Sequence, residues 1–435
     1  MKTDILVVGS GCAGLYCAMH LPTNREILII TKDKEDCSDS FLAQGGICML
    51  KDESDYDSYF NDTMRAGHFE NNPESVEIMI RSSKDVVEDL IGYGVDFQRE
   101  SDGSLCFTRE GGHSDKRILF HEDITGKEIT GKLLAEAKRH SNIKIAEYCT
   151  MLDIISEENV CQGAIVKNKE GEIFPIYAEV TVLACGGIGG LYRHTTNYRH
   201  LTGDGVAVAL RHGISLEHIN YVQIHPTTLY TEHTEEKSFL ISESVRGEGA
   251  VLYNAKKERF VDELLPRDVL TKKIYEQMEN DGAPFVWLSM EHIPREEIMS
   301  HFPNIVRHCR KHGYDVLQEC IPVVPAQHYF MGGIKVDMHS KTSMERLYAV
   351  GETACNGVHG KNRLASNSLL ESLVFARRAA DKISEKPFGA NNAPRKELGA
   401  ELNAYQNGEA LAQQYKKDIL DEIERLNKLC MIQSQ

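Results

Sequence analysis

The stretch DILVVGSGCAGLYCAMHL, residues 4–21, decides the fold class of this 435-residue chain. It joins a short apolar run to a glycine-rich turn and a helix-forming segment, and a second apolar run, EILIIT, follows at 26–31. This order of strand, glycine turn, helix and strand is typical of a parallel sheet covered by helices on both faces. We therefore expect an α/β fold.

The glycine turn itself predicts a dinucleotide site of the Rossmann type. Its first glycine allows the tight turn, the second lets the backbone approach a pyrophosphate, and the third lets the helix pack closely on the strand. The amino end of the helix would then face the phosphates. The predicted contacts are Gly9, Ser10, Gly11, Cys12, Ala13 and Gly14. The second strand ends in Thr31 and Lys32 instead of the usual acidic residue, which disfavours NAD.

The composition changes along the chain and suggests how the domains are arranged. Residues 219–329 are rich in polar helix and loop sequence with several prolines and histidines, and strand patterns resume near Ile334. We expect a discontinuous Rossmann-type domain at 1–218 and 330–388, with an α+β capping domain inserted at 219–329. Residues 389–435 are expected to be a short helical C-terminal segment.

Two helices are predicted from their apolar spacing. Residues 73–92 repeat apolar positions every three or four residues, which indicates one amphipathic helix. A second helix, from about Glu409, carries a narrow apolar seam, which needs something to pack against. The core of the same chain or a partner subunit could cover it. The seam consists of Leu411, Tyr415, Ile419, Ile423, Leu426 and Cys430.

Composition and charge exclude several classes of function. The formal net charge of −16 argues against a nucleic-acid ligand, and no apolar run is long enough to cross a bilayer. The amino end lacks an export signal, and the 12 cysteines form no CxxC pair, so we expect a cytoplasmic protein with reduced thiols. His301, His308 and His312 are expected to be solvated helix positions, and no metal site is predicted. An acidic ligand would need a local group of cations to overcome the net charge.

Eight motifs follow one another along the chain. They are SDSFLAQGGI (38–47), TREGGHS (108–114), TGDG (202–205), HPT (225–227), SESVRGEG (242–249), LPRD (265–268), PAQHYFMGG (325–333) and VGETACNGVHGKNRLASNSLLES (350–372). In this order they resemble the L-aspartate oxidase family, within the wider group of fumarate reductase and succinate dehydrogenase flavoproteins. The resemblance covers about residues 1–385. It implies FAD-dependent oxidation of L-aspartate to iminoaspartate, the first step of NAD biosynthesis, with O2 or fumarate as electron acceptor.

The resemblance also implies how FAD is bound. Asp39 stands where succinate dehydrogenases have the histidine that bonds covalently to the flavin, so FAD is expected to be non-covalent. Ser368 and Leu369 would begin a helix whose positive end faces the flavin pyrimidine oxygen. The other implied FAD contacts are Lys32, Ser38, Ser40, Ala43, Gln44, Gly45, Gly46, Asp204 and Glu352.

A dicarboxylate site is implied by the same family motifs. Arg267 matches the residue that transfers a proton, with Glu243 and Arg246 as candidates for a relay. Glu110 is a carboxylate that fumarate reductases lack at this point, and it implies a partner for the substrate ammonium. The residues that match carboxylate-binding positions are His225, Ser242, His328 and Arg363.

Two other functions stay open at this point. A soluble fumarate reductase would use the same arginines and histidines on a dicarboxylate that has no amine. A flavin-binding module that carries electrons or senses a signal would need none of them for turnover. In the family, quinolinate synthase consumes the unstable iminoaspartate, which implies a functional coupling to that enzyme.

Overall fold

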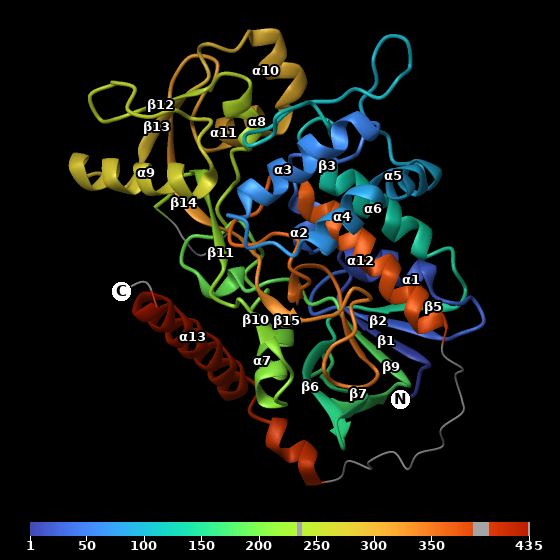
Figure 1. The fold of residues 1–435 in the computed structure, drawn as a ribbon. Coiled ribbons are helices and arrows are strands. Elements are labelled where there is room, and N and C mark those ends of the chain that lie inside the picture. The colour runs from blue at the N-terminus through green and yellow to red at the C-terminus, as the bar shows by residue number, and fades with distance from the viewer. Residues whose placement is uncertain (233–236, 386–399, 434–435) are drawn as a thin grey trace.

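A computed structural model describes residues 1–232, 237–385 and 400–433 of the chain (Figure 1). Its centre is a five-stranded parallel sheet in the order β16-β9-β1-β2-β5. All residues of the middle strand β1 are buried, and it pairs in parallel register with β2 and β9. Burial on both faces explains the unbroken apolar run. The α/β prediction is confirmed. The strands are β1 (Ile5–Val8), β2 (Ile27–Ile30), β5 (Ile143–Ala146), β9 (Val180–Leu183) and β16 (Leu347–Ala349).

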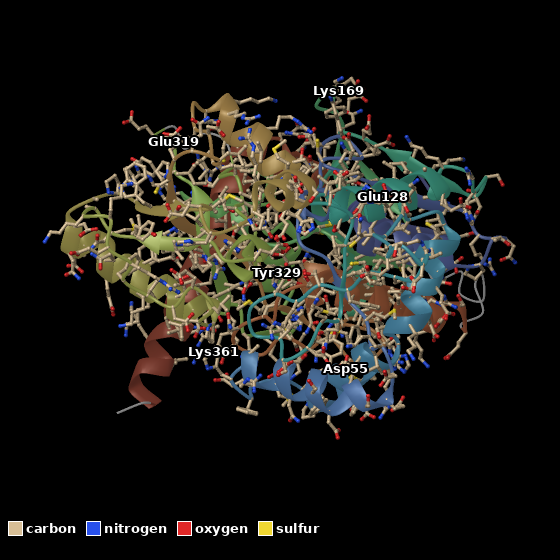
Figure 2. All side chains as sticks on the ribbon, turned by 90° about the horizontal axis from the view of Figure 1, so that it is seen from above. Asp55, Glu128, Lys169, Glu319, Tyr329 and Lys361 are labelled. Carbon is tan, nitrogen blue, oxygen red and sulfur yellow. The ribbon has the colours of Figure 1, made fainter. Side chains whose placement is uncertain are left out.

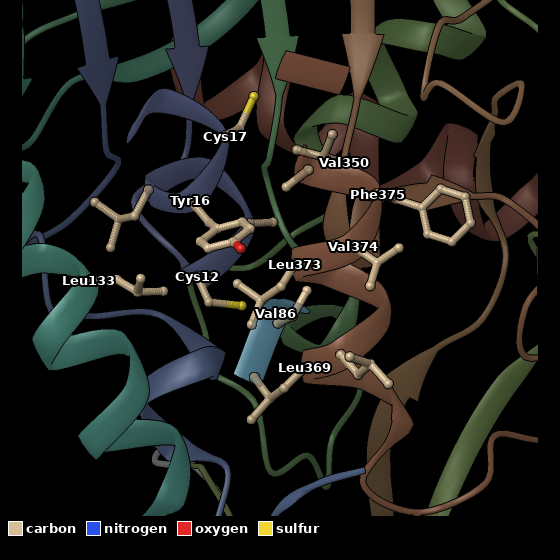
Figure 3. Close-up of a cluster of buried hydrophobic side chains, with 14 of the residues drawn as sticks. Cys12, Tyr16, Cys17, Val86, Leu133, Val350, Leu369, Leu373, Val374 and Phe375 are labelled. Atoms are coloured by element: carbon tan, nitrogen blue, oxygen red, sulfur yellow. The ribbon is translucent and has the colours of Figure 1, made fainter. Parts of the chain in front are cut away.

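One face of this sheet is covered by α1 (Cys12–His20), α6 (Thr125–Ala137) and α12 (Asn367–Ser384). Figure 3 shows Tyr16, Leu133 and Leu373 from these three helices in a single buried cluster, and each is at most 1% exposed. The packing fixes the amino ends of α1 and α12 near the carboxyl edge of the sheet, where ligands of such folds bind.

The opposite face packs against a second layer. This layer contains α7 (Asp204–Arg211) and the antiparallel strands β6 (Thr150–Glu157), β7 (Val160–Lys167) and β8 (Ile173–Tyr177). The C-terminal helix α13 (Gly408–Gln433) lies along α7 (Figure 1). Its seam residues Tyr415 and Ile419 are 5% and 0% exposed within this layer, so the seam packs on its own chain. The side chain of Cys430 and residues 386–399 lie outside the described part.

A second unit, which we call the cap, is built on the antiparallel sheet β11-β14-β13-β12. Figure 1 shows it beside and above the parallel sheet, which with its covering layers we call the sheet unit. The inserted α+β unit expected from the sequence is present, and its boundary residues stay predictions. Its elements are β11 (Val222–Leu229), α8 (Glu243–Gly247), β12 (Val251–Tyr253), α9 (Arg267–Asp281), β13 (Val286–Ser289), α10 (Arg295–His301), α11 (Pro303–Lys311) and β14 (Ile321–Phe330).

The prediction of one helix over 73–92 is wrong. The segment forms α4 (Pro73–Arg81) and α5 (Ser83–Gly92), separated at Ser82. The hydroxyl of Ser83 donates to Ile80 O at 2.6 Å and accepts from Leu50 N at 2.9 Å. A serine that bonds the backbone in this way competes with the helical ladder, and apolar spacing does not report it.

Smaller elements connect these layers. No helix in the described residues is long and apolar enough to span a bilayer. The short elements are α2 (Asp39–Leu42), β3 (Ile47–Cys48), α3 (Tyr56–Ala66), β4 (Ile118–Leu119), β10 (Leu216–Glu217), β15 (Gly333–Lys335) and β17 (Ala354–Cys355).

Candidate active site

A cavity of about 510 Å³ lies between the sheet unit and the cap. It opens at the carboxyl ends of β1, β2 and β9, which is where parallel sheets bind ligands. Every site residue predicted from the sequence lines this cavity except Gly14 and the relay candidate Arg246. The candidates for cofactor and substrate binding therefore come together, although they are scattered over most of the chain.

The glycine turn has the close contacts that a dinucleotide turn needs. Gly9 has φ 122°, and a Cβ there would lie 2.0 Å from the carbonyl oxygen of Ala184. At Gly14 a Cβ would lie 2.1 Å from Gly9 O, so this glycine lets α1 pack against β1 and does not face the cavity. The amide of Cys12 donates to Ser40 Oγ at 3.1 Å, which joins the amino end of α1 to the 38–46 loop.

Three polar atoms of that loop are buried without a hydrogen-bond partner among the described residues. They are Ser38 Oγ, Asp39 Oδ2 and Gln44 Oε1, and their residues line the cavity. Buried polar atoms are almost always paired, so atoms of this kind beside a cavity fit a ligand rich in polar groups. The residues present therefore fit FAD, with its pyrophosphate, its sugar hydroxyls and its flavin edge.

Carboxyl groups supply further polar contacts along the cavity. Lys32 Nζ donates to both carboxylate oxygens of Asp204, at 3.2 and 2.9 Å, which holds Asp204 at the start of α7. Glu352 Oε1 accepts the amide of Phe330 at 2.9 Å. Burial, together with the charge of Asp39, raises the pKa of Glu352 to about 8, and burial raises the pKa of Asp39 to about 7.

At the cap side of the cavity two arginines lie side by side. Gln223 Oε1 accepts from Arg267 Nη1 at 2.8 Å and from Arg363 Nε at 3.2 Å. Arg267 begins α9 in the cap and Arg363 precedes α12 in the sheet unit, and they are 7% and 5% exposed. Burial and the neighbouring Arg267 lower the pKa of Arg363 to about 10. An anion between the two guanidinium groups would offset their mutual repulsion.

The guanidinium of Arg363 also lies over the ring of Tyr329, 4.5 Å from its centroid. Figure 2 shows Tyr329 near the middle of the molecule, with labelled residues such as Glu319 and Lys169 at its rim. Tyr329 is 7% exposed and both arginines are buried, so the arginine pair is deep in the protein. Desolvated charges attract an anion more strongly than solvent-exposed ones.

Glu243 connects Arg267 to the interior of the cap. Arg267 Nε donates to Glu243 Oε2 at 2.5 Å, and Arg246 Nη2 lies 3.8 Å from the same oxygen. Burial alone would raise the pKa of Glu243, but the charges of Arg267 and Arg246 bring it below its usual value. The three residues proposed as a proton relay are therefore in contact.

The two predicted histidines face each other in the cavity wall. The rings of His225 and His328 have centroids 5.1 Å apart at an interplanar angle of 70°. His225 Nδ1 lies 3.2 Å from Thr227 N and 3.1 Å from Thr227 O, so it accepts or donates according to the tautomer of the ring. Its Nε2 is buried without a hydrogen-bond partner among the described residues. Burial and nearby arginine charge hold the pKa of both histidines well below the usual range, so both are neutral at physiological pH.

Glu110 is buried where the sheet unit meets the cap. Ser244 Oγ donates to its Oε1 at 2.8 Å and Ser366 Oγ donates to its Oε2 at 2.6 Å. A Cβ at Gly45 would lie 2.7 Å from Glu110 Oε1, so this carboxyl group lies against the loop expected to wrap the flavin. Burial, followed by the charge of Glu243, raises the pKa of Glu110.

Ser242 Oγ accepts the amide of Ser244 at 3.3 Å and starts α8.

The structure adds residues that the sequence analysis missed. Gln223 stands two positions before His225 on β11, so strand alternation places both side chains on one face, and this signal could have identified it. Ser244 and Ser366 lie inside the quoted motifs but were given no role. The expectation that His308 is solvated is wrong, because it is half-buried, lines the cavity and stacks on Phe239 with ring centroids 3.6 Å apart.

Comparison with known proteins identifies the family. A family model described as FAD binding domain matches residues 4–369. The L-aspartate oxidase of Clostridium perfringens (strain 13 / Type A) is 51% identical over 381 residues, which are 88% of this chain and 86% of that protein. The chain belongs to the L-aspartate oxidase family.

Other members and a solved structure agree with this assignment. The L-aspartate oxidase of Clostridium acetobutylicum is 48% identical over 384 residues, or 88% of each chain. The structure of E. coli quinol fumarate reductase FrdA matches with a TM-score of 0.85 and 30% identity, and covers 96% of this chain and 74% of that one. The predicted family, the FAD-binding fold with its cap and the FAD cofactor are confirmed.

Proposed function

We propose that this chain oxidises L-aspartate to iminoaspartate with FAD held in the cavity, and passes the electrons to O2 or fumarate as the first step of NAD biosynthesis. Relatives named L-aspartate oxidase at about half identity support the substrate. The observation that carries the proposal is the distribution of charge in one cavity. The arginine pair Arg267 and Arg363 offers sites for carboxylates, and Glu110 offers a site for an ammonium group.

The arginines and the neutral histidines orient the substrate. Arg363 and Arg267 bind its carboxylates. His225 and His328, each in the tautomer with hydrogen on Nε2, present a ring N–H that can donate to a carboxylate oxygen. Several fixed donors from different elements hold Cα in one position, and transfer of its hydrogen depends steeply on that position. Glu110 accepts from the ammonium group and fixes the orientation in which Cα presents its single hydrogen.

Formation of the C=N bond requires two losses. The ammonium group loses a proton, and Cα loses its hydrogen together with two electrons. Bound FAD supplies the acceptor for those electrons. Arg267 remains protonated in most settings, so it moves a proton only with help from neighbouring charge. Its contact with Glu243, and the contact of Glu243 with Arg246, provide a route that takes the proton away from the substrate.

The proposal includes the setting of the reaction. Asp39 offers no imidazole to the flavin, so we propose that FAD is held without a covalent bond. The described cysteines are free thiols, which is consistent with a reducing cytoplasm. Iminoaspartate is unstable in water, which supports a functional coupling to quinolinate synthase as its consumer.

The competing proposal is a fumarate reductase, which the match to FrdA favours because the same cations bind any small dicarboxylate. Hydrogen peroxide release with L-aspartate, compared with succinate, separates the two. We expect release with L-aspartate at a rate at least ~10-fold above that with succinate, the scale of one charge-assisted hydrogen bond. In Glu110→Gln, L-aspartate oxidation should fall roughly 10- to 100-fold while fumarate reduction is kept. Equal losses in both reactions would contradict the role of Glu110.

A further inference from the structure

The cap is joined to the sheet unit by one buried carboxylate that the proposed chemistry does not use. Asp123, just before α6, is 2% exposed. Its Oδ2 accepts the backbone amides of Asn304 and Ile305, both at 3.0 Å, and its Oδ1 accepts Asn304 Nδ2 at 3.1 Å. Asn304 and Ile305 lie in the first turn of α11, so a residue of the sheet unit caps a helix of the cap.

Helix α11 has no cap of its own. The residue before it, Phe302, makes no side-chain capping bond, and Pro303 at its first position carries no N–H. The amides of Asn304 and Ile305 are therefore the first donors that need an acceptor, and Asp123 supplies it. A helix capped from another unit depends on that unit staying in place.

Both ends of this contact are rigidly attached to functional parts. Phe302 and Ile305 are 3% and 0% exposed in the core of the cap, so α11 moves only with the cap. On the other side, Gly126 N donates to Ala43 O at 2.8 Å and Thr125 Oγ1 donates to Gly45 O at 2.5 Å. The turn that carries Asp123 is thus bonded to the loop expected to wrap the flavin.

We propose that Asp123 is a positioning residue that holds the cap closed over the cavity by capping α11 from the sheet unit. Closure brings Arg267 and His225 of the cap to Arg363 of the sheet unit. The identity of the ligand in this inference rests on the proposed function. The closed position itself is measurable without turnover.

Other contacts between the two units are less suited to this task. His68 Nε2 lies 3.0 Å from Asp268 Oδ2, but these side chains are 44% and 41% exposed, and exposed pairs contribute little. The contacts of Glu110 and Gln223 cross between the units inside the active site, so changing them would alter catalysis directly. Asp123 and Asn304 also line the cavity, but neither is among the residues expected to bind substrate or FAD. Changing Asp123 therefore weakens closure and leaves those residues in place.

The test uses the oxidised holoenzyme and the variant Asp123→Ala. Loss of a helix cap should shift the balance between closed and open cap by roughly 5- to 30-fold toward open. Iodide should then quench the fluorescence of bound FAD more strongly than in wild type, and saturating fumarate should restore wild-type quenching. KM for L-aspartate should rise by up to the same factor while kcat stays within about two-fold, because only the closed fraction binds substrate.

Three control variants separate positioning from ordinary stabilisation. Asp123→Asn keeps an acceptor for both amides and should restore most of the wild-type quenching and KM. Asn72→Ala removes the cap of α4, where Asn72 Oδ1 accepts Glu74 N at 3.0 Å and Ser75 N at 3.3 Å, entirely inside the sheet unit. It should lower Tm and leave quenching unchanged. His68→Ala should leave both unchanged.

Unchanged quenching and KM in Asp123→Ala, with only a lower Tm, would overturn the inference. If that variant does not fold, Asn304→Ala decides. It removes the bond to Asp123 Oδ1 and an exposed bond from Arg307 within α11, keeps both backbone amides on Asp123, and should raise quenching by a smaller factor. Wild-type quenching in Asn304→Ala would overturn the inference. Quenching does not require L-aspartate oxidation. The quenching result can therefore be interpreted even if L-aspartate is not the substrate.

Discussion

Arg267 takes its orientation from two acceptors on different elements. Gln223 on β11 and Glu243 on α8 hold its guanidinium from two directions, at 2.8 and 2.5 Å. A guanidinium fixed in this way presents its remaining donors to the cavity with little loss of side-chain entropy. Its contact with the buried Glu243 also gives it a neighbour for proton exchange.

Replacing Arg267 with leucine should separate flavin binding from turnover. We expect Arg267→Leu to retain bound yellow FAD and to lose at least ~10²-fold in turnover, the scale of a proton-transfer residue. Flavin reduction by L-aspartate in anaerobic stopped-flow measures this loss. Lys273→Leu, on the same helix with its side chain 52% exposed, is the matched control and should keep wild-type turnover. Unchanged turnover in Arg267→Leu would refute its role in proton transfer.

The raised pKa of Glu352 predicts how the stability of the apoprotein depends on pH. Burial and the charge of Asp39 raise the pKa of Glu352 from 4.5 to about 8, so the folded state keeps a proton that the unfolded state loses between these values. The stabilisation from this group is complete below pH 4.5 and is lost as pH rises to 8. The Tm of the apoprotein should therefore fall more across this window in wild type than in Glu352→Gln. Parallel Tm profiles would contradict the assignment.

At the level of single residues, the motifs predicted the cavity well and its supporting contacts poorly. His225, Arg267 and Arg363 could be identified because their residue types and motif positions point to dicarboxylate chemistry. Asp123 could not, since it acts by holding another group across a large separation in sequence. Such a contact depends on tertiary packing, which a motif does not record.

Among the elements, the C-terminal helix α13 supports the cofactor side of the cavity. Ile419 is fully buried, and its Cδ1 lies 2.8 Å from where a Cβ of Gly203 would be. Gly203 immediately precedes Asp204 at the start of α7, in the TGDG motif. The helix therefore packs directly behind a loop that we expect to contact FAD.

Shortening Ile419 should weaken this region measurably. Ile419→Ala leaves a cavity and should lower the free energy of unfolding by about 2–5 kcal/mol in urea titrations of the apoprotein. The neighbouring Leu420 is 37% exposed on the other face of the helix, so Leu420→Ala should cost less than about 1 kcal/mol. Equal losses in the two variants would show that α13 is not anchored by its seam.

Elements whose signal lies in adjacent residues could be predicted from the sequence. Prediction failed where a contact with a distant part of the chain decides the structure. The buried strand β1 and the glycine turn carry their signal in adjacent residues. The break at Ser82 arises from hydrogen bonds of Ser83, one of them to Leu50, far away along the chain. Apolar spacing is the same on both sides of that break, so periodicity predicted one helix.

For the whole molecule, the net charge of −16 opposes the approach of an acidic substrate. Three exposed cations line the cavity: Lys127 on α6, and Arg307 and Lys311 on α11. With the buried arginine pair, they place positive charge at and inside the cavity of an anionic protein. A local positive field of this kind raises the rate at which anions arrive.

Added salt should therefore lower kcat/KM, and the decrease should be larger for a substrate with more negative charge. Fumarate carries one more net negative charge than L-aspartate at neutral pH, so kcat/KM for fumarate reduction should fall more steeply between about 0.01 and 0.15 M salt. Alanine at Lys127, Arg307 and Lys311 together should flatten both dependences. Equal slopes for the two substrates would contradict electrostatic steering by this cavity.

An anaerobic titration of the purified holoenzyme with L-aspartate, followed in the flavin absorption band, tests the proposed activity most directly. The expected result is full loss of the oxidised flavin band with L-aspartate, its return when air is admitted, and at most slow bleaching with succinate. A protein that binds no flavin, or a flavin band that L-aspartate leaves unchanged, would contradict the proposal that the cations of this cavity hold L-aspartate for oxidation.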